Sequence, residues 1–161
     1  MSSISVKIPI FCSFLVSNSF PPPSSSSSFS SSSSFNFSNV VIDITTKVKG
    51  VRIDSCANVT ILLHGALSGI EVVNSKRMKM QVKDRVPSVA IDKTDGCLVG
   101  LPWSSRDALI TSSKSSEMNV TFPASEAEDA DWLEAPIPEQ FVSKIGSNGK
   151  ITTHVSELYS S

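Results

Sequence analysis

The sequence predicts an all-β protein, a parallel β-helix with about twenty residues in each coil, preceded by a disordered leader. Short runs that alternate apolar and polar residues recur from Val40 onward, polar residues interrupt them at nearly constant spacing, and helical periodicity is weak throughout. The 161-residue chain has a net charge of −1, which gives no bulk attraction to nucleic acid or to an anionic membrane. Its apolar runs are too short for a membrane span.

Residues 1–38 differ in composition from the rest of the chain. Serine occupies ten of the eleven positions from Ser24 to Ser34, three prolines precede them, and the stretch has no acidic residue. Such a segment buries too little apolar surface to offset the conformational entropy lost on folding, so we expect disorder. The apolar run IPIFCSFLV (8–16) leaves an N-terminal targeting peptide open as another interpretation. We expect the folded domain at 39–161.

Nine β-type runs follow one another in this domain, at 41–46, 51–54, 59–63, 69–73, 78–82, 88–91, 97–101, 108–111 and 118–122. Most of them alternate apolar with polar residues, which is the period of a strand with one buried face. The inward side chains are expected to stack as the core, and the set comprises Ile53, Leu62, Val72, Met80, Val89, Ile91, Leu98, Ile110 and Val120.

Polar residues mark the corners between the runs. They stand at Asp54-Ser55, Asn74-Ser75, Lys93-Thr94 and Lys114-Ser115, so the intervals from 55 to 75, 94 and 115 are twenty, nineteen and twenty-one residues. Equivalent positions in neighbouring coils lie ~4.8 Å apart, which predicts that these four positions form a column. An antiparallel sandwich is the alternative, but before residue 148 only Asp95-Gly96 gives a tight hairpin signal.

The C-terminal part of the sequence predicts an extended segment followed by a hairpin. In ASEAEDADWLEAPIPEQF (124–141), Pro136 and Pro138 exclude a helix or a central strand. The apolar residues of this stretch are expected to anchor it on the solenoid, and they are Trp132, Ile137 and Phe141. In SKIGSNGKITTHVSEL (143–158), the Asn-Gly pair at 148–149 between two β-like runs is the strongest hairpin signal of the chain.

Candidate catalytic and metal-ligating residues lack partners in the sequence. His64 and His154 are far apart, and Cys97 has no histidine in its local sequence, so each is expected in a structural role. We therefore predict a protein that is not an enzyme and that has no metal site and no cofactor.

Four stretches together resemble the C-terminal domain of the cyclase-associated proteins, a family of actin regulators. They are VPSVAIDKTDGCLVGL (86–101), SSKSSEMNV (112–120), APIPEQF (135–141) and NGKITTHVSEL (148–158). The resemblance runs from about Asn39 to Leu158. It implies a right-handed parallel β-helix that dimerises by exchanging C-terminal strands, binds ADP-loaded actin monomers and promotes their exchange of ADP for ATP. It also implies a cytoplasmic, cytoskeleton-associated location and a possible association with adenylyl cyclase.

Matched position by position, the resemblance implies an actin-facing surface on two neighbouring corners. DKTDG contributes Asp92, Lys93, Thr94 and Asp95, while KSSEMN contributes Lys114, Ser115, Ser116, Glu117, Met118 and Asn119. The last stretch implies a dimerisation hairpin that includes Asn148, Gly149, Ile151, Thr153 and Val155. A cluster of cations near this surface is either a solvated face or a contact with acidic actin, and it comprises Lys76, Arg77, Lys79, Lys83 and Arg85.

The family domain has further coils before the position of Asn39, where this chain has serine, which implies a shortened and less stable end of the solenoid. Two alternatives to the actin-binding function are a purely structural or inactive β-helix and a GTPase activator like tubulin-folding cofactor C. Cofactor C supplies an arginine from a Gln-Leu-Arg motif to the phosphoryl transition state, and this chain has no such motif.

Overall fold

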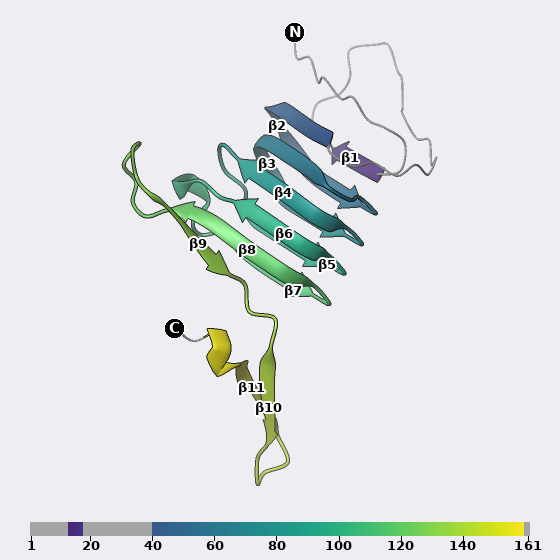
Figure 1. Cartoon of the computed structure of the whole chain (residues 1–161), viewed down its shortest axis with the longest axis vertical. Helices are drawn as coiled ribbons and strands as arrows, with labels where there is room; N and C mark the ends of the chain where they lie inside the picture. Colours follow the sequence, from purple (N-terminus) through teal and green to yellow (C-terminus); the bar gives the residue numbers. More distant parts are fainter. Residues whose placement is uncertain (1–12, 18–39, 160–161) are drawn as a thin grey trace.

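The computed structural model describes residues 13–17 and 40–159 (Figure 1). Most of the predicted disordered leader, including its whole serine run at 24–34, lies outside these residues. In the described part the chain winds into a parallel β-solenoid, from which a C-terminal hairpin extends (Figure 1). The prediction of a β-helix is therefore confirmed.

The solenoid coils are built from the strands β2 (Val40–Asp54), β3 (Val59–Val73), β4 (Lys76–Val82), β5 (Ser88–Asp92), β6 (Asp95–Gly100), β7 (Leu109–Ser113) and β8 (Ser116–Pro123). The first two are long enough to run through both faces of a coil. In the next two coils the chain divides into β4 and β5, then into β6 and β7. Pro87 directly precedes β5 and Pro102 follows β6, and neither residue has a backbone N–H to donate to the ladder.

Every pairing between neighbouring coils is parallel, which excludes the antiparallel sandwich. On one face β3 pairs with β4, β4 with β6, and β6 with β8. On the other face the C-terminal half of β3 pairs with β5, and β5 pairs with β7. Equivalent residues of successive coils thus stand above one another, as in the core column formed by Val51, Ile70, Val89 and Ile110.

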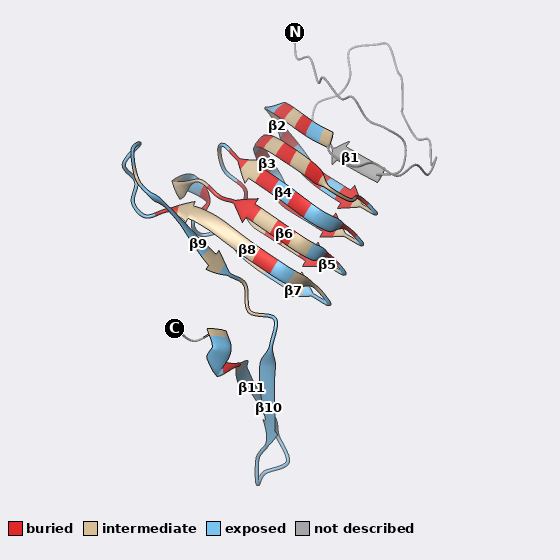
Figure 2. Ribbon diagram, in the orientation of Figure 1, coloured by how far each residue is buried: buried red, intermediate tan, exposed pale blue. Residues whose placement is uncertain are grey.

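The core consists of inward side chains between the two faces. Along the solenoid strands, buried residues alternate with less buried ones (Figure 2). Of the nine residues predicted to be inside, five are fully buried: Ile53, Val72, Met80, Val89 and Ile91. Ile110 and Val120 are half-buried and pack against the core, because they belong to the last coil and have no further coil beyond them.

The prediction was wrong for Leu62 and Leu98, which point outward. In CLVGL neither face has a polar residue, so alternation alone allows two registers, whereas in VTILL the polar Thr60 shares the outward face with Leu62. The neighbours Ile61, Leu63 and Val99 are buried instead, and Leu98 lies in an outward row between Lys79 and Asn119.

An antiparallel strand lies at each end of the solenoid. At the first end, β1 (Ser13–Ser17) pairs with residues 50–54 of β2, and this strand lies within the leader, most of which was predicted to be disordered. At the other end, β9 (Trp132–Pro136) pairs with β8. Both strands cover parts of edges that would otherwise present unpaired backbone groups.

The segment after β9 is held on the solenoid less extensively than predicted. Ile137 packs against the core and donates its N–H to the carbonyl of Met118 at 2.8 Å. Trp132 and Phe141 are exposed, so they do not anchor the segment as expected. The short 3-10 helices η1 (Trp103–Ser105) and η2 (Glu157–Tyr159) complete the described elements.

Candidate functional site

Each of the four corners along one edge of the solenoid contains two residues with left-handed backbone conformation. Equivalent positions of successive coils form two columns of such residues. The first column contains Ser55, Asn74, Lys93 and Lys114, with φ of 57°, 49°, 47° and 49°. The second column contains Asn58, Arg77, Gly96 and Glu117, with φ of 54°, 51°, 78° and 52°. Residues other than glycine rarely adopt this conformation. Its recurrence at equivalent positions of successive coils shows that each coil makes the same turn here.

Between these two columns a ladder of hydroxyl groups joins the coils. The Ser75 hydroxyl accepts the N–H of Cys56 at 3.2 Å, the Thr94 hydroxyl accepts the N–H of Ser75 at 3.4 Å, and the Ser115 hydroxyl accepts the N–H of Thr94 at 3.1 Å. Each hydroxyl also donates to the carbonyl two residues before it. Short polar side chains at these positions therefore satisfy backbone groups that the turn leaves unpaired.

This ladder confirms three of the four predicted positions of the corner column and corrects the fourth. Cys56, not Ser55, is in line with Ser75, and the true intervals are 19, 19 and 21 residues. The prediction aligned Ser55 with Ser75 because both are serines, whereas in the structure Cys56 occupies the position equivalent to Ser75. Ser55 belongs to the neighbouring left-handed column.

The exposed parts of the two predicted corners lie together. Asp92 pairs with Ser113 and Asp95 with Ser116, so Lys93 stands directly above Lys114. The Ser116 hydroxyl donates to the Asp95 carboxylate at 2.8 Å. We call this patch the corner surface, and it comprises Asp92, Lys93, Asp95, Lys114, Ser115, Ser116, Glu117 and Asn119.

Two residues predicted for the actin-facing surface are inside the protein, and their assignment is corrected. Thr94 is 1% exposed and belongs to the hydroxyl ladder, while Met118 is 2% exposed and belongs to the core. The left-handed turn at Glu117 redirects the chain, so Met118 points inward directly after an exposed residue. Neither side chain can touch a partner of the folded domain.

Glu139, which the sequence analysis did not single out, completes the last corner. Its carboxylate accepts a hydrogen bond from the backbone N–H of Glu117 at 2.8 Å. In the first coil the equivalent N–H, that of Asn58, donates to a backbone carbonyl of the next coil, that of Lys76, at 2.9 Å. Glu139 thus replaces the carbonyl that a further coil would supply. A cavity of about 350 Å³ lies here between Lys114, the neighbouring serines and Phe141. No motif signals this contact, because Glu139 arrives from a segment outside the repeat.

The cations of the structure fall into paired and unpaired groups. Lys47 contacts Asp84 at 3.1 Å, and this hydrogen bond lowers the pKa of the Asp84 carboxyl below its ordinary value. Arg85 forms an ion pair with Asp107 at 2.6 Å, so it differs from the other residues of the predicted basic cluster in having a charge partner. The remaining cations of that cluster and of the corner surface form no ion pair within 40–159, and they are Lys76, Arg77, Lys79, Lys83, Lys93 and Lys114.

The C-terminal hairpin consists of β10 (Phe141–Ile145) and β11 (Ile151–Val155). Its turn is longer than a two-residue connection. Gly149 donates to the Gly146 carbonyl at 2.9 Å, Gly149 alone in the turn has a positive φ, of 75°, and the Asn148 carboxamide accepts the N–H of Lys150 at 3.0 Å. The hairpin predicted from Asn148 and Gly149 is thus confirmed.

One face of this hairpin is apolar and exposed. Strand alternation places Ile151, Thr153 and Val155 on this face, as predicted, opposite Ile145, Ser143 and Phe141. Phe141 is 54%, Ile145 79% and Ile151 68% exposed. In water such a face is unfavourable, which makes it a candidate for contact with another surface.

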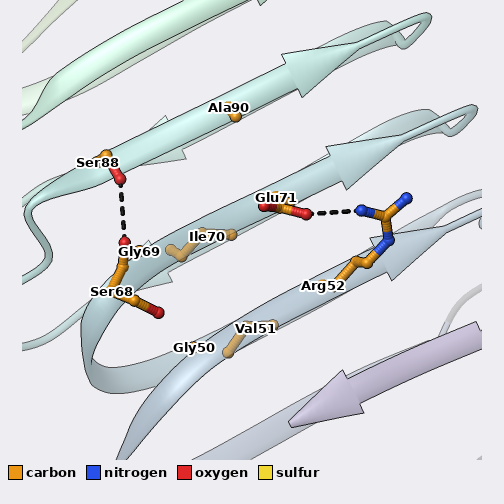
Figure 3. Close-up of a pocket in the computed structure, with 9 residues that line it drawn as sticks. All are labelled: Gly50, Val51, Arg52, Ser68, Gly69, Ile70, Glu71, Ser88 and Ala90. Carbon is orange, nitrogen blue, oxygen red and sulfur yellow. Dashed lines mark hydrogen bonds and ion pairs between the residues drawn. The ribbon is translucent and has the colours of Figure 1, made fainter. Parts of the chain in front are cut away.

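A separate shallow groove lies on the face of the solenoid formed by β2, the C-terminal half of β3 and β5 (Figure 3). Small residues of three coils form its floor, including Gly50, Gly69 and Ser88, and its volume is about 390 Å³. Arg52 lies beside it and contacts Glu71 at 2.7 Å (Figure 3). The two charged residues that line the groove, Arg52 and Glu71, are therefore paired with each other.

Cys97 is buried in the core, and burial raises the pKa of its thiol to about 12. A thiol with this pKa is protonated at neutral pH and is a poor nucleophile, which agrees with the structural role predicted for it. Within 13–17 and 40–159 no three side chains of His, Cys, Asp or Glu gather as a metal site requires. These same residues include no helix long and apolar enough to cross a bilayer.

Comparison with known proteins gives a consistent assignment. Residues 30–158 match the family model described as the adenylate cyclase associated (CAP) C terminal domain. The chain is 40% identical over 124 residues to the adenylyl cyclase-associated protein of Dictyostelium discoideum, covering 77% of this chain and 26% of that protein. It is 38% identical over 124 residues to adenylyl cyclase-associated protein 1 of Bos taurus, covering 77% of this chain and 25% of that protein.

A solved structure shares the fold. The crystal structure of cyclase-associated protein from Cryptosporidium parvum superposes with a TM-score of 0.64 at 36% sequence identity, covering 72% of this chain and 69% of that chain. The chain spans about a quarter of the length of the curated relatives that it matches. It belongs to the cyclase-associated protein family, as a member that contains the family's C-terminal β-solenoid domain.

Proposed function

We propose that this chain is an actin-monomer-binding module that promotes exchange of ADP for ATP on actin and is not itself an enzyme. Family membership supports this proposal, and the observation that carries it is the corner surface. Two neighbouring corners display unpaired lysines, Lys93 and Lys114, beside the carboxylates of Asp95 and Glu117. Exposed charges of both signs on rigid corners suit recognition of a protein partner.

The mechanism is differential binding rather than chemistry. A partner that binds nucleotide-free actin more tightly than ADP-actin must weaken ADP binding by the same coupling free energy. This requires a surface that fits one state of actin better than the other, and it needs no nucleophile, general base or metal ion. The hydroxyl ladder suits this role because it holds the corners in one conformation.

Release of labelled ADP from actin monomers tests this function. We expect the full chain to accelerate release in proportion to the fraction of actin bound. Binding without acceleration would leave a binding module that is not an exchange factor. Absence of binding at micromolar concentration would contradict the proposed function altogether.

The C-terminal hairpin provides a route to a homodimer. Its exposed apolar face has the alternation of a strand that packs on another surface, and β7 has one edge without a described partner strand. We propose that hairpins of two copies exchange and bury these faces. Two linked actin-binding surfaces would raise avidity for actin without new contacts.

Deletion of residues 149–161 is expected to convert a dimer into a monomer. The deletion removes β11 and therefore the partner of β10, so the apolar face cannot form. Sedimentation equilibrium at micromolar concentration measures the change. A full-length chain that sediments as a monomer would contradict the strand exchange, and Lys144→Glu, on the opposite face of the hairpin, serves as a control that should stay dimeric.

The family name also motivates two broader parts of the proposal. The relatives are named for association with adenylyl cyclase, and we propose the same association for the whole protein of which such a domain is part. We propose a cytoplasmic, cytoskeleton-associated location, since that is where actin monomers are found. Co-purification with adenylyl cyclase and with actin tests these two statements separately.

A further inference from the structure

A narrow groove runs along β6 on the face of the solenoid next to the corner surface. The outward residues of this strand are Gly96, Leu98 and Gly100, so the floor has only one side chain of any size. Two cavities of about 220 and 160 Å³ lie over this floor and share Lys79 and Leu98. The first lies toward the Gly96 end of the strand and the second toward the Gly100 end, with Leu98 common to both.

The sequence creates this groove by placing glycine where the neighbouring coils have long side chains. Gly96 stands between Arg77 and Glu117 in the left-handed column, and its missing side chain leaves the space between them open. At the other end, the amide of Gln81 lies over Gly100, where a Cβ atom would come within 2.2 Å of it. The Gln81 amide therefore closes the groove at its Gly100 end.

The two walls of the groove have opposite charges. Arg77 and Lys79 of β4 form one wall, while Glu117 of β8 and Glu134 of β9 form the other. Asn119 donates to the Glu134 carboxylate at 2.7 Å and fixes its position. No ion pair joins these four side chains across the groove. Both sets of charges are therefore available to a partner.

We infer that this groove, which we call the β6 groove, anchors an extended segment of the actin monomer. The segment presents a carboxylate to Arg77 and Lys79, an apolar side chain to Leu98, and a cation to Glu134. This inference rests on the proposed function. Glu117 and Asn119 belong both to the groove and to the corner surface, so one partner can contact the two without a gap.

The charge pattern is what selects this occupant. An acidic peptide without a cation would leave the carboxylates of the second wall unpaired, and a basic peptide would oppose the first wall. The apolar floor at Leu98 requires an apolar side chain between the two charges. An extended segment meets these requirements because its side chains alternate and because the groove is parallel to a strand.

A charge swap across the groove tests the inference. Lys79→Glu combined with Glu134→Lys reverses the walls and leaves the net charge of −1 unchanged, so long-range attraction to actin is not altered. We expect Kd for ADP-actin monomers to rise at least ten-fold, measured by fluorescence titration. The matched control is Lys144→Glu with Glu128→Lys, which makes the same exchange at exposed positions outside the groove and the corner surface and should change Kd less than two-fold.

Further variants keep the test decisive if the swap lowers stability. Leu98→Gln removes the apolar floor and Lys79→Gln removes one charge, each as a single outward change, and both should weaken binding while the thermal midpoint stays that of the unaltered chain. Binding of all three groove variants within two-fold of the unaltered chain, or an equal loss in the control swap, overturns the β6 groove assignment. Failure of the unaltered chain to bind actin instead contradicts the proposed function itself.

Discussion

Replacement of Thr94 by valine is expected to lower the free energy of unfolding by about 1–3 kcal/mol. Valine has nearly the same shape as threonine but cannot accept or donate a hydrogen bond. The buried N–H of Ser75 would lose its acceptor, and the Asp92 carbonyl would lose one of its donors. Chemical denaturation monitored by circular dichroism measures the change.

The matched variant is Thr94→Ser, which keeps the hydroxyl and removes only a methyl group. It should retain most of the stability that valine loses. If the valine variant is as stable as the unaltered chain, the hydroxyl ladder contributes nothing to folding, and the corners are held by the strand pairings alone.

Reversal of charge at the two stacked lysines, Lys93→Glu with Lys114→Glu, is expected to weaken binding of ADP-actin by roughly 1–3 kcal/mol. Both side chains are exposed, stand one coil apart and have no ion pair in the described part of the chain. The fold should be unaffected, since exposed charges at corners contribute little to stability. Affinity for ADP-actin monomers and the thermal midpoint are the two measurements.

Lys144→Glu changes charge at an exposed position outside the corner surface and should bind as the unaltered chain does. Unchanged affinity of the double lysine variant would show that the corner surface does not contact actin. Loss of affinity accompanied by a lower thermal midpoint would also contradict the assignment, because the effect would then come from unfolding.

The sequence was sufficient to predict the solenoid because each coil repeats the same local signals. Alternation located the strands, and the polar corners at 75, 94 and 115 located the turns. These signals depend only on residues within one coil and its neighbour. The hairpin was predicted for the same reason, since Asn148 and Gly149 define it locally.

The sequence failed where a position depends on contacts that composition does not encode. Alternation cannot choose between faces in CLVGL, and only stacking on β4 and β8 turns Leu98 outward. Strand β1 could not be predicted either. Its pairing with residues 50–54 depends on the free edge of β2, which exists only once the coils have formed.

The candidate site was predicted in outline and corrected in detail. A motif places Thr94 and Met118 among exposed neighbours, but the left-handed residues at Lys93 and Glu117 decide which side chains point outward. The residues contributed by β9 and the following segment, Glu134 and Glu139, come from outside the repeat. Their contacts are set by the path of the returning chain, which no periodic pattern describes.

The stacking of coils also determines how this domain gains and loses structure over time. The hydroxyl ladder joins residues only 19 to 21 positions apart, so each coil can form against its neighbour with a short loop to close. Folding of such an array can start at any coil and spread along the axis. Amide hydrogens of β3, β4 and β6, with coils on both sides, should exchange with solvent most slowly, while those of β7 exchange early.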